Sequence, residues 1–259
     1  MQITEIFQLS PSTVFFIGFI PPVIGAFLSI AIAFLFYNDE ISNYNWQCGR
    51  ARFPSLSRII NLPLGRIIWQ ISILAHVPVR FIELFTGLSR YKRLLSVNYK
   101  YKKYYELYRY TYFYSGMIEL LLLSGVSIIG ERERLHVCLF YLYGLFSMIF
   151  FISNIKCHRQ SLYYLNPYGR ISYYAKITLC MGFLTTAPIL FCAFMLYWKA
   201  CITVAYDIFA LCEYLEVAFT ILYHGCAFFD IRYKVKFSVR VAEEIQSIED
   251  STISANLQL

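Results

Sequence analysis

Six apolar stretches, each long enough to cross a lipid bilayer as a helix, dominate this sequence. The hydrocarbon core of a bilayer needs about 20 residues of helix, and a helix satisfies its backbone hydrogen bonds internally. The alternating segments of about 10 residues that are typical of a membrane β-barrel are absent. We therefore expect an all-α polytopic membrane protein, a six-transmembrane-helix bundle. The spans are predicted near Val14–Tyr37, Leu64–Thr86, Thr111–Ile129, Val137–Ile155, Ile177–Trp198 and Asp207–Phe229.

The connections between these stretches are short, which predicts a single membrane domain, residues 1–241, followed by a disordered tail, residues 242–259. With 58% hydrophobic and 15% charged residues, the composition is far from that of a soluble domain. The first stretch has no basic residue before it and is too long for a signal-peptide core, so we expect a retained span. Pro21 and Pro22 are expected to kink or break it.

The distribution of Lys and Arg predicts the orientation of the bundle. Fifteen of these residues lie in the connections and tail on the side of both termini, seven of them in 87–110, and six lie in the connections on the other side. By the positive-inside rule both termini are cytosolic. The net charge of +7 reflects this asymmetry and contact with anionic headgroups, so no nucleic-acid partner is expected.

The basic segment 87–110 is also rich in tyrosine. An aromatic belt at the membrane interface, with snorkelling Lys and Arg side chains, is the favoured interpretation. A phosphoinositide-binding role is the alternative.

Ionisable residues inside two of the apolar stretches are the main indication of function. A charge at the bilayer centre costs roughly 2.5 to 3.5 kcal/mol, so such residues usually face the bundle interior and mark a functional site. No nucleotide loop or zinc spacing accompanies them, and neither a metal nor a cofactor is expected. The second stretch contains His76, Arg80 and Glu83, and the last contains or adjoins Glu213, Glu216, His224 and Asp230.

Helical periodicity brings the polar residues of the second stretch onto one face. At about 100° per residue, His76 and Arg80 differ by about 40°, and His76 and Glu83 by about 20°. Glu119 in the third stretch lies at a similar depth. Arg80 needs a carboxylate there, and Glu119 is the best candidate. We expect a cluster of Arg80, Glu119 and His224, with His76 above it.

Three interpretations of this cluster remain open at this point. The residues could be polar contacts between helices, which are common in membrane proteins. They could bind a lipid headgroup or acyl chain. A buried histidine with a carboxylate neighbour could also be a general base for acyl transfer, although no Ser or Cys nucleophile stands in an obvious motif beside it. A transporter is less favoured, because the sequence has no inverted repeat.

Of the eight cysteines, only Cys48 and Cys201 fall in the connections on the non-cytosolic side. An oxidising lumen permits a disulfide between them. From the cysteines alone, this disulfide and two free thiols are equally open. The other cysteines are expected to be buried or reduced.

The chain resembles the post-GPI-attachment-to-proteins factor 2 family, within the larger group that includes the damage-regulated autophagy modulators. The resemblance covers nearly the whole chain, although each motif is short. Phe228-Phe229 stand where that family has tryptophans, and Arg50-Ala51-Arg52 follow the first motif, which indicates a divergent, factor 2-like member. The matching residues are Cys48-Gly49, Pro54-Ser55, His76-x-Pro78-x-Arg80-Phe81, Glu119, Glu213-Tyr214, His224 and Asp230.

The resemblance implies lipid remodelling of glycosylphosphatidylinositol (GPI) anchors in the secretory pathway. Such proteins are needed for reacylation of the lyso-GPI intermediate, and hence for stable surface expression of GPI-anchored proteins. It also implies a multi-pass protein of the Golgi membrane or the endoplasmic reticulum membrane. A luminal cysteine before the last span of the family corresponds to Cys201, which favours the Cys48–Cys201 disulfide.

For a catalytic role we assign His76 as the base, Glu119 or Glu213 as its orienting carboxylate, and Arg80 as a charge stabiliser. The expected partners are membrane lipids, the lyso-GPI intermediate and other GPI-remodelling membrane proteins. Whether the protein is an acyltransferase or an accessory factor is open, and a non-enzymatic membrane scaffold or lipid organiser is the rival function. The residues assigned to substrate binding are Arg80, Glu216, His224 and Asp230.

Overall fold

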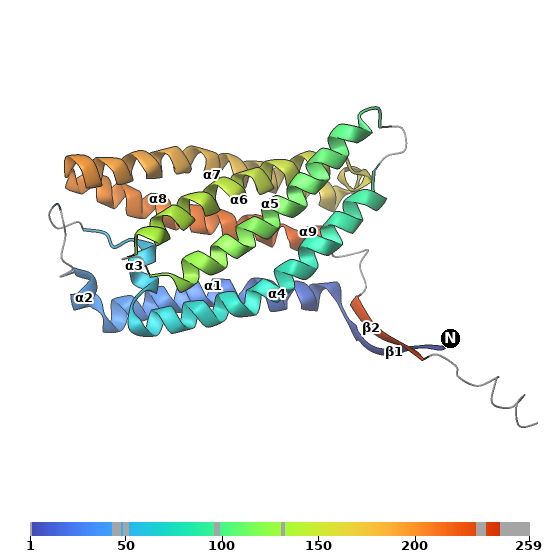
Figure 1. Cartoon of the computed structure of the whole chain (residues 1–259), viewed down its shortest axis with the longest axis horizontal. Coiled ribbons are helices and arrows are strands. Elements are labelled where there is room, and N and C mark those ends of the chain that lie inside the picture. Colours follow the sequence, from blue (N-terminus) through green and yellow to red (C-terminus); the bar gives the residue numbers. More distant parts are fainter. Residues whose placement is uncertain are drawn as a thin grey trace, which may run out of the picture.

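The computed structural model describes residues 2–42, 48, 52–95, 99–130, 133–231 and 237–243. Its long helices form one elongated bundle (Figure 1). The elements follow in the order β1 (Gln2–Leu9), α1 (Pro11–Phe36), α2 (Asn38–Ser42), α3 (Leu56–Ile60), α4 (Pro63–Arg93), α5 (Lys102–Ile128), α6 (Arg134–Gln160), η1 (Leu162–Leu165), α7 (Pro167–Ala200), α8 (Thr203–Gly225), α9 (Ala227–Ile231) and β2 (Phe237–Glu243).

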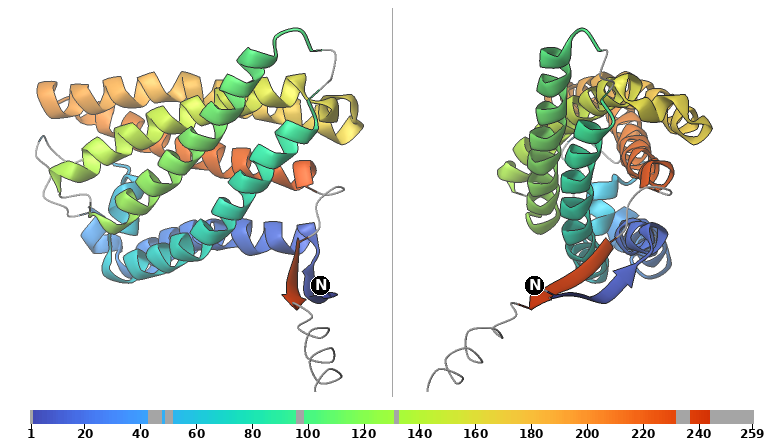
Figure 2. Two further views of the ribbon diagram at one scale, coloured as in Figure 1. Left: turned by 45° about the vertical axis from the view of Figure 1, so that its right-hand side comes forward. Right: turned by 90° about the vertical axis from the view of Figure 1, so that its right-hand side faces the viewer.

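The long helices pair as neighbours in the bundle. Helix α1 packs on α4, α5 on α6, and α7 on α8, and further contacts of α4 with α5 and of α6 with α7 join the pairs. Figure 2 shows the α1–α4 pair on one side of the bundle and the α7–α8 pair on the other. We call the end with Cys48, Cys201 and α3 the disulfide end, and the opposite end, with β1 and α9, the termini end.

Within the described residues, five helices are long and apolar enough to cross a membrane, namely α1, α4, α5, α6 and α7. Their outward side chains are large and apolar; Phe27 and Ile71, for example, are 72% and 63% exposed. Helix α8 spans 23 residues and is therefore also long enough, but it carries Asp207, Glu213 and Glu216. Length and composition thus support a multi-pass membrane protein with five candidate spans.

The helices extend beyond the predicted apolar stretches at the termini end. Helix α4 continues to Arg93, α5 begins at Lys102, and α7 begins at Pro167. A helix can continue past the hydrocarbon core because its hydrogen bonds stay internal and its Lys and Arg side chains reach water. Hydropathy detects only the apolar part of a helix, so these helices are longer than the apolar stretches found in the sequence.

The helices differ from the predicted spans at two further points. Helix α1 continues through Pro21 and Pro22 from Pro11 to Phe36, so these prolines do not break it. The last predicted span divides at Cys226, where α8 ends and the short helix α9 begins.

A two-stranded ribbon outside the bundle was not expected. Strands β1 and β2 pair antiparallel, with Gln2 opposite Glu243. In Figure 1 this ribbon projects away from the helices at the termini end. The ribbon joins the N-terminal arm to the start of the segment expected to be a disordered tail. Residues 244–259 of that tail lie outside the described residues. Gly49, which follows Cys48 in the motif of the first loop, also lies outside them.

Candidate functional site

A network of buried charged residues, which we call the central cluster, joins α4, α5 and α8. Arg80 donates to Glu83 at 2.7 Å and to Glu119 at 3.4 Å, and the other oxygen of Glu119 lies 3.0 Å from Nε2 of His224. Arg80 and Glu119 are each only 2% exposed. The expected contact of Arg80, Glu119 and His224 is therefore present. We include His76 in the cluster because its ring lines the same cavities as His224.

His76 is held by the backbone of α1, and the prolines of that helix explain how. Pro22 has no N–H group, so the carbonyl of Gly18, four residues earlier, lacks its helical partner. Nδ1 of His76 lies 2.6 Å from that carbonyl oxygen. Because a carbonyl can only accept, Nδ1 carries the proton and Nε2 of His76 is left as an acceptor. This contact satisfies the carbonyl that Pro22 frees, and α1 continues as a helix.

The carboxylate predicted to orient His76 instead orients His224. Glu119 contacts Nε2 of His224, whereas His76 contacts the carbonyl of Gly18. Glu213 lies at the disulfide end and does not orient His76 either. A carboxylate that accepts from one imidazole nitrogen leaves the other nitrogen able to accept a proton. His224, which we had assigned to substrate binding, is therefore the histidine with the paired carboxylate.

A largely apolar cavity connects the central cluster with α3. Glu213 borders it near α3, while His76 and His224 border it at the cluster. Glu213 and His224 are eleven residues apart on α8, so their positions are separated by about 16 Å along the helix axis. Its apolar walls come from α1, α3, α4, α5, α6 and α8 and include Ile60, Trp69, Ile73, Leu123, Phe140, Val217 and Ile221. Such a shape suits an apolar chain with a polar group at one end.

Glu213 supports the backbone of α3. Its two oxygens accept from the N–H groups of Leu56 at 2.7 Å and Ser57 at 3.2 Å, in the first turn of that helix. The first N–H groups of a helix have no partner within it, and a carboxylate there also meets the positive end of the helix dipole. Glu213 therefore acts as a capping group for α3 in this structure.

Two further contacts fix the segment before α3 at the disulfide end. One oxygen of Asp207 accepts from the N–H groups of Arg52 and Phe53, both at 2.8 Å. The predicted disulfide between Cys48 and Cys201 is present, and the two Cα atoms lie 4.8 Å apart. The start of α8 and its preceding turn thus hold the connection that leads into α3.

Glu216 lies on α8 one turn after Glu213 but contacts a different helix. It accepts a short hydrogen bond from the Thr186 hydroxyl on α7. Glu213 instead accepts from α3, so these two carboxylates hold different elements of the bundle. Glu216 also lies outside the residues that line the cavity.

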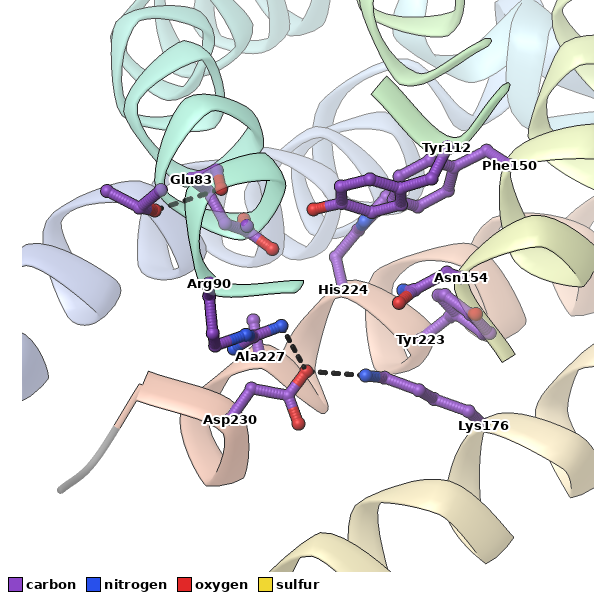
Figure 3. A pocket seen from close by; sticks show the side chains of 12 residues that line it. Glu83, Arg90, Tyr112, Phe150, Asn154, Lys176, Tyr223, His224, Ala227 and Asp230 are labelled. Atoms are coloured by element: carbon purple, nitrogen blue, oxygen red, sulfur yellow. Dashed lines mark hydrogen bonds and ion pairs between the residues drawn. The ribbon is translucent and has the colours of Figure 1, made fainter. Parts of the chain in front are cut away.

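Asp230 is the centre of a second group of buried charges, the termini-end cluster, which Figure 3 shows. One carboxylate oxygen accepts from Lys176 at 2.5 Å and from Arg90 at 3.3 Å. The other accepts from the Ser172 hydroxyl at 2.8 Å. Helices α4, α7 and α9 meet at this single side chain. Asp230, which we had assigned to substrate binding, is thus a buried carboxylate with two cationic partners.

These partners determine how Asp230 ionises. Burial alone would raise the pKa of its carboxyl group, but the opposing charges of Lys176 and Arg90 hold that pKa below its usual range. The carboxylate is therefore ionised throughout the physiological pH range.

His158 completes the termini-end cluster without adding charge. Its Nε2 lies 2.9 Å from the carbonyl oxygen of Gly169, so Nε2 carries a proton. Its Nδ1 lies 3.2 Å from the ammonium group of Lys176, which can only donate. One proton on Nε2 and a lone pair on Nδ1 define a neutral imidazole.

Sequence reasoning missed Arg90, Lys176 and His158 as site residues. Arg90 and Lys176 were counted as charges in connections, because the second apolar stretch ends before Arg90 and the fifth begins after Lys176. Arg90 lies seven residues after Glu83 and so on the same helical face. Extending the face of His76, Arg80 and Glu83 by two turns would have found it. No comparable signal in the sequence marks His158.

The chemistry available to these clusters is proton transfer and the binding of lipid or anionic groups. Within the described ranges, no group of three or more His, Cys, Asp or Glu side chains is arranged to hold a metal ion.

The comparison with protein families matches residues 11–234 to the Frag1/DRAM/Sfk1/Cwh43P N-terminal domain. Comparisons with curated proteins and with solved structures gave no match. The matched range includes every helix of the bundle, both clusters and the apolar cavity. The chain therefore belongs to the Frag1/DRAM/Sfk1/Cwh43P family.

Proposed function

We propose that this protein takes part in the remodelling of GPI-anchor lipids, at the step that reacylates the lyso-GPI intermediate. It would be a factor 2-like member of its family, embedded in the Golgi or endoplasmic reticulum membrane. Its partners would be membrane lipids, the lyso-GPI intermediate and other GPI-remodelling membrane proteins. In this proposal α8 is the sixth span, the disulfide end faces the lumen and both termini are cytosolic.

The inward position of the acidic residues on α8 supports a sixth span. Glu213 and Glu216 are only 3% and 7% exposed, and both accept hydrogen bonds from other elements of the bundle. Side chains on the outward face, such as Val204 and Leu211, are apolar and 62% and 54% exposed. A helix of this kind can lie in lipid because its carboxylates face protein.

The apolar cavity is the observation that carries the proposed function. It leads from α3 and Glu213, at the disulfide end, to the two histidines of the central cluster. A fatty acyl chain could lie along its apolar walls with the reacting carbonyl or hydroxyl near His76 or His224. Because the cavity extends from the disulfide end to the histidines, a lipid held at that end could reach them with its reacting group.

Acyl transfer to a lyso-lipid needs a base that removes a proton from the attacking hydroxyl. His76 presents Nε2 as an acceptor because its Nδ1 faces the Gly18 carbonyl. His224 has the further support of Glu119 at 3.0 Å, which would stabilise an imidazolium. Either histidine could therefore accept the hydroxyl proton as the hydroxyl oxygen attacks the carbonyl of an ester or thioester donor. The imidazolium could then return this proton to the oxygen or sulfur atom that leaves the acyl group, which gives the free alcohol or thiol.

A non-enzymatic lipid organiser is the second candidate, and one observation favours it. Arg80, Glu119 and His224 satisfy one another without any ligand. A network of this kind can serve only to hold helices together. The cavity would then hold a lipid without chemistry.

The first experiment measures anchor lipids in cells that lack the protein and are supplied with variants. We expect loss of the protein to cause lyso-GPI to accumulate in mass spectra and surface levels of a GPI-anchored reporter to fall. H76A and H224A should fail to restore both. H136A is the matched control, because His136 also borders the cavity but lies outside the central cluster. Unchanged anchor lipids without the protein would refute the proposal.

The second experiment separates chain binding from catalysis. V217F narrows the cavity, whereas V204F adds the same bulk on the outer face of α8, where Val204 is 62% exposed. Both binding and reacylation should be reduced by V217F and retained by V204F. If H76A and H224A restore the reporter fully while V217F does not, the protein is a lipid organiser without catalysis.

A further inference from the structure

Helix α3 closes the apolar cavity at the disulfide end. Leu56, Ser57 and Ile60 of this helix line the cavity. Four of its five residues are buried, and only Ser57 is partly exposed. The helix contacts α1, α4 and α8, so it lies inside the bundle rather than on its surface. A chain that extends along the cavity from the two histidines therefore meets α3 at the far end.

The closed end is held at both ends of α3. At the start of the helix, two of its N–H groups donate to Glu213, and the Tyr206 hydroxyl donates to that of Ser55 at 3.0 Å. At the end of the helix, the side-chain amide of Asn61 donates to the Ser57 carbonyl at 2.6 Å. Because these contacts fix the position of α3, they also fix the point at which a chain in the cavity must stop.

Large apolar side chains form much of the surface at the closed end. Ile60 of α3 and Trp69 of α4 border the cavity and belong to one buried cluster with Leu56 and Ile73. The ring nitrogen of Trp69 donates to the Ser127 hydroxyl at 3.1 Å, so α5 holds the indole in place. This surface suits the methyl end of an acyl chain better than a polar headgroup, which would lose its hydrogen bonds with water there.

The polar groups at the two ends of the cavity favour one direction for such a chain. At the closed end, both oxygens of Glu213 accept from the backbone of α3. The hydroxyl of Ser127 accepts from Trp69 and donates to the Leu123 carbonyl at 2.8 Å. At the other end, Nε2 of His76 is left as an acceptor. We therefore expect the polar end of the chain at the histidines and its methyl end at α3.

We propose that α3 limits the length of the acyl chain that the cavity accepts, and that Ile60 is the residue against which the methyl end stops. Glu213, which holds α3, and His224 are separated by about 16 Å along α8. An extended chain advances by about 1.2 Å per bond, so this distance corresponds to a straight chain of about 14 carbons. That the chain belongs to a reacylation substrate rests on the proposed function, whereas the limit on its length rests on the cavity and α3.

The first test measures how binding depends on chain length. The purified full-length chain in detergent is titrated with straight-chain saturated fatty acids from decanoic to eicosanoic acid, and native mass spectrometry measures the bound fraction. Each further methylene group that the cavity buries should raise the affinity about fourfold. The increase should end near about 14 carbons, where the methyl end reaches α3. An affinity that rises across the whole series, or no saturable binding, overturns the proposal.

The variants I60A and I59A test the closed end itself. I60A removes side-chain atoms that border the cavity, so the longest chain that gains affinity should become about two carbons longer. I59A is the matched control on the same helix, because Ile59 packs with Ala33 and Ile41 and lies outside the residues that line the cavity. Both variants lose buried contacts, but only I60A should change the length limit. An unchanged limit in I60A, or an equal change in I59A, overturns the proposal.

I60F gives a test with the opposite sign. The larger side chain should make the limit about two carbons shorter, so the longest chains should lose affinity while the shortest keep theirs. A purely structural role of Ile60 would instead lower the affinity for every chain alike, which would count against the proposal. If I60F fails to fold, I60A and the wild-type length profile decide the matter.

Anchor lipids from cells separate this inference from the proposed function. In cells that lack the protein and are supplied with I60A, mass spectra should show longer acyl chains on the anchors than with the wild type or I59A. If the purified chain shows the length limit and its change, but loss of the protein leaves the anchors unaltered, the length limit stands and the proposed reacylation fails. If the wild type restores the anchors and I60A and I60F leave their chain lengths unchanged, the proposed function stands and the length limit fails.

Discussion

The two ends of the bundle use acidic side chains in different ways. At the disulfide end, Asp207 and Glu213 accept hydrogen bonds from neutral backbone N–H groups. At the termini end, Asp230 accepts from the charged groups of Lys176 and Arg90. A backbone N–H that loses its acceptor remains neutral, whereas a buried cation that loses its carboxylate remains charged. The same substitution should therefore be far more costly at the termini end.

The largest effect is expected for D230N. The asparagine keeps the size of the side chain but leaves Lys176 and Arg90 without their counter-charge in a buried site. Removing one partner of a buried ion pair typically lowers the free energy of unfolding by about 3 to 5 kcal/mol. Thermal unfolding of the purified wild type and of D230N in detergent measures this loss of stability.

The double variant D230N/K176M provides the control for this prediction. It removes the carboxylate and one cation together, so it should be less destabilised than D230N alone. If D230N unfolds at the wild-type temperature, Asp230 does not balance the buried cations and the contrast between the two ends is lost.

The second largest effect concerns the Cys48–Cys201 disulfide. It closes a loop with a sequence separation of 153 residues. Removing a native disulfide typically lowers the free energy of unfolding by about 2 to 4 kcal/mol. The variant C48S/C201S should show this loss, and a reducing agent should produce it in the wild type but not in the variant. C138S, which replaces a free and exposed cysteine, is the control.

The central cluster shows how much of the site could be predicted from the sequence. Helical periodicity and depth were sufficient to bring Arg80, Glu119 and His224 together, because straight helices carry these residues at predictable heights. The orientation of His76 was not predictable. It depends on the Gly18 carbonyl of a neighbouring helix, and hydropathy does not show which helices are neighbours.

The same limit explains what was missed at the ends of the fold. Hydropathy detects apolar turns, so it ended the second span at Thr86 and left Arg90 in a connection. The role of Glu213 depends on α3, a five-residue helix too short to give a periodic signal. Charged helix ends and short helices give no hydropathy signal, so only their contacts in the structure identify them.

An intermediate effect is expected for E213Q. Glutamine can still accept one hydrogen bond at the start of α3 but loses the negative charge, so the free energy of unfolding should fall by about 1 to 2 kcal/mol. As a capping group, Glu213 should be replaceable by glutamine with little loss of GPI-anchored reporter at the cell surface. A stable E213Q protein without activity would restore the catalytic role first predicted for this residue.

The smallest effect is expected for D207N. Both backbone N–H groups, from Arg52 and Phe53, contact a single oxygen of Asp207, and the amide oxygen of asparagine can take the same place. Asp207 is only partly buried, so water replaces part of the lost interaction. The free energy of unfolding should fall by about 0.5 kcal/mol, below the effect of E213Q. Thermal unfolding of D207N beside D230N, each an Asp-to-Asn change, then measures the difference between the two ends directly. If D207N and D230N lose equal free energy of unfolding, the charge of the donors does not determine the cost of removing the carboxylate. That result would contradict the comparison between the two ends.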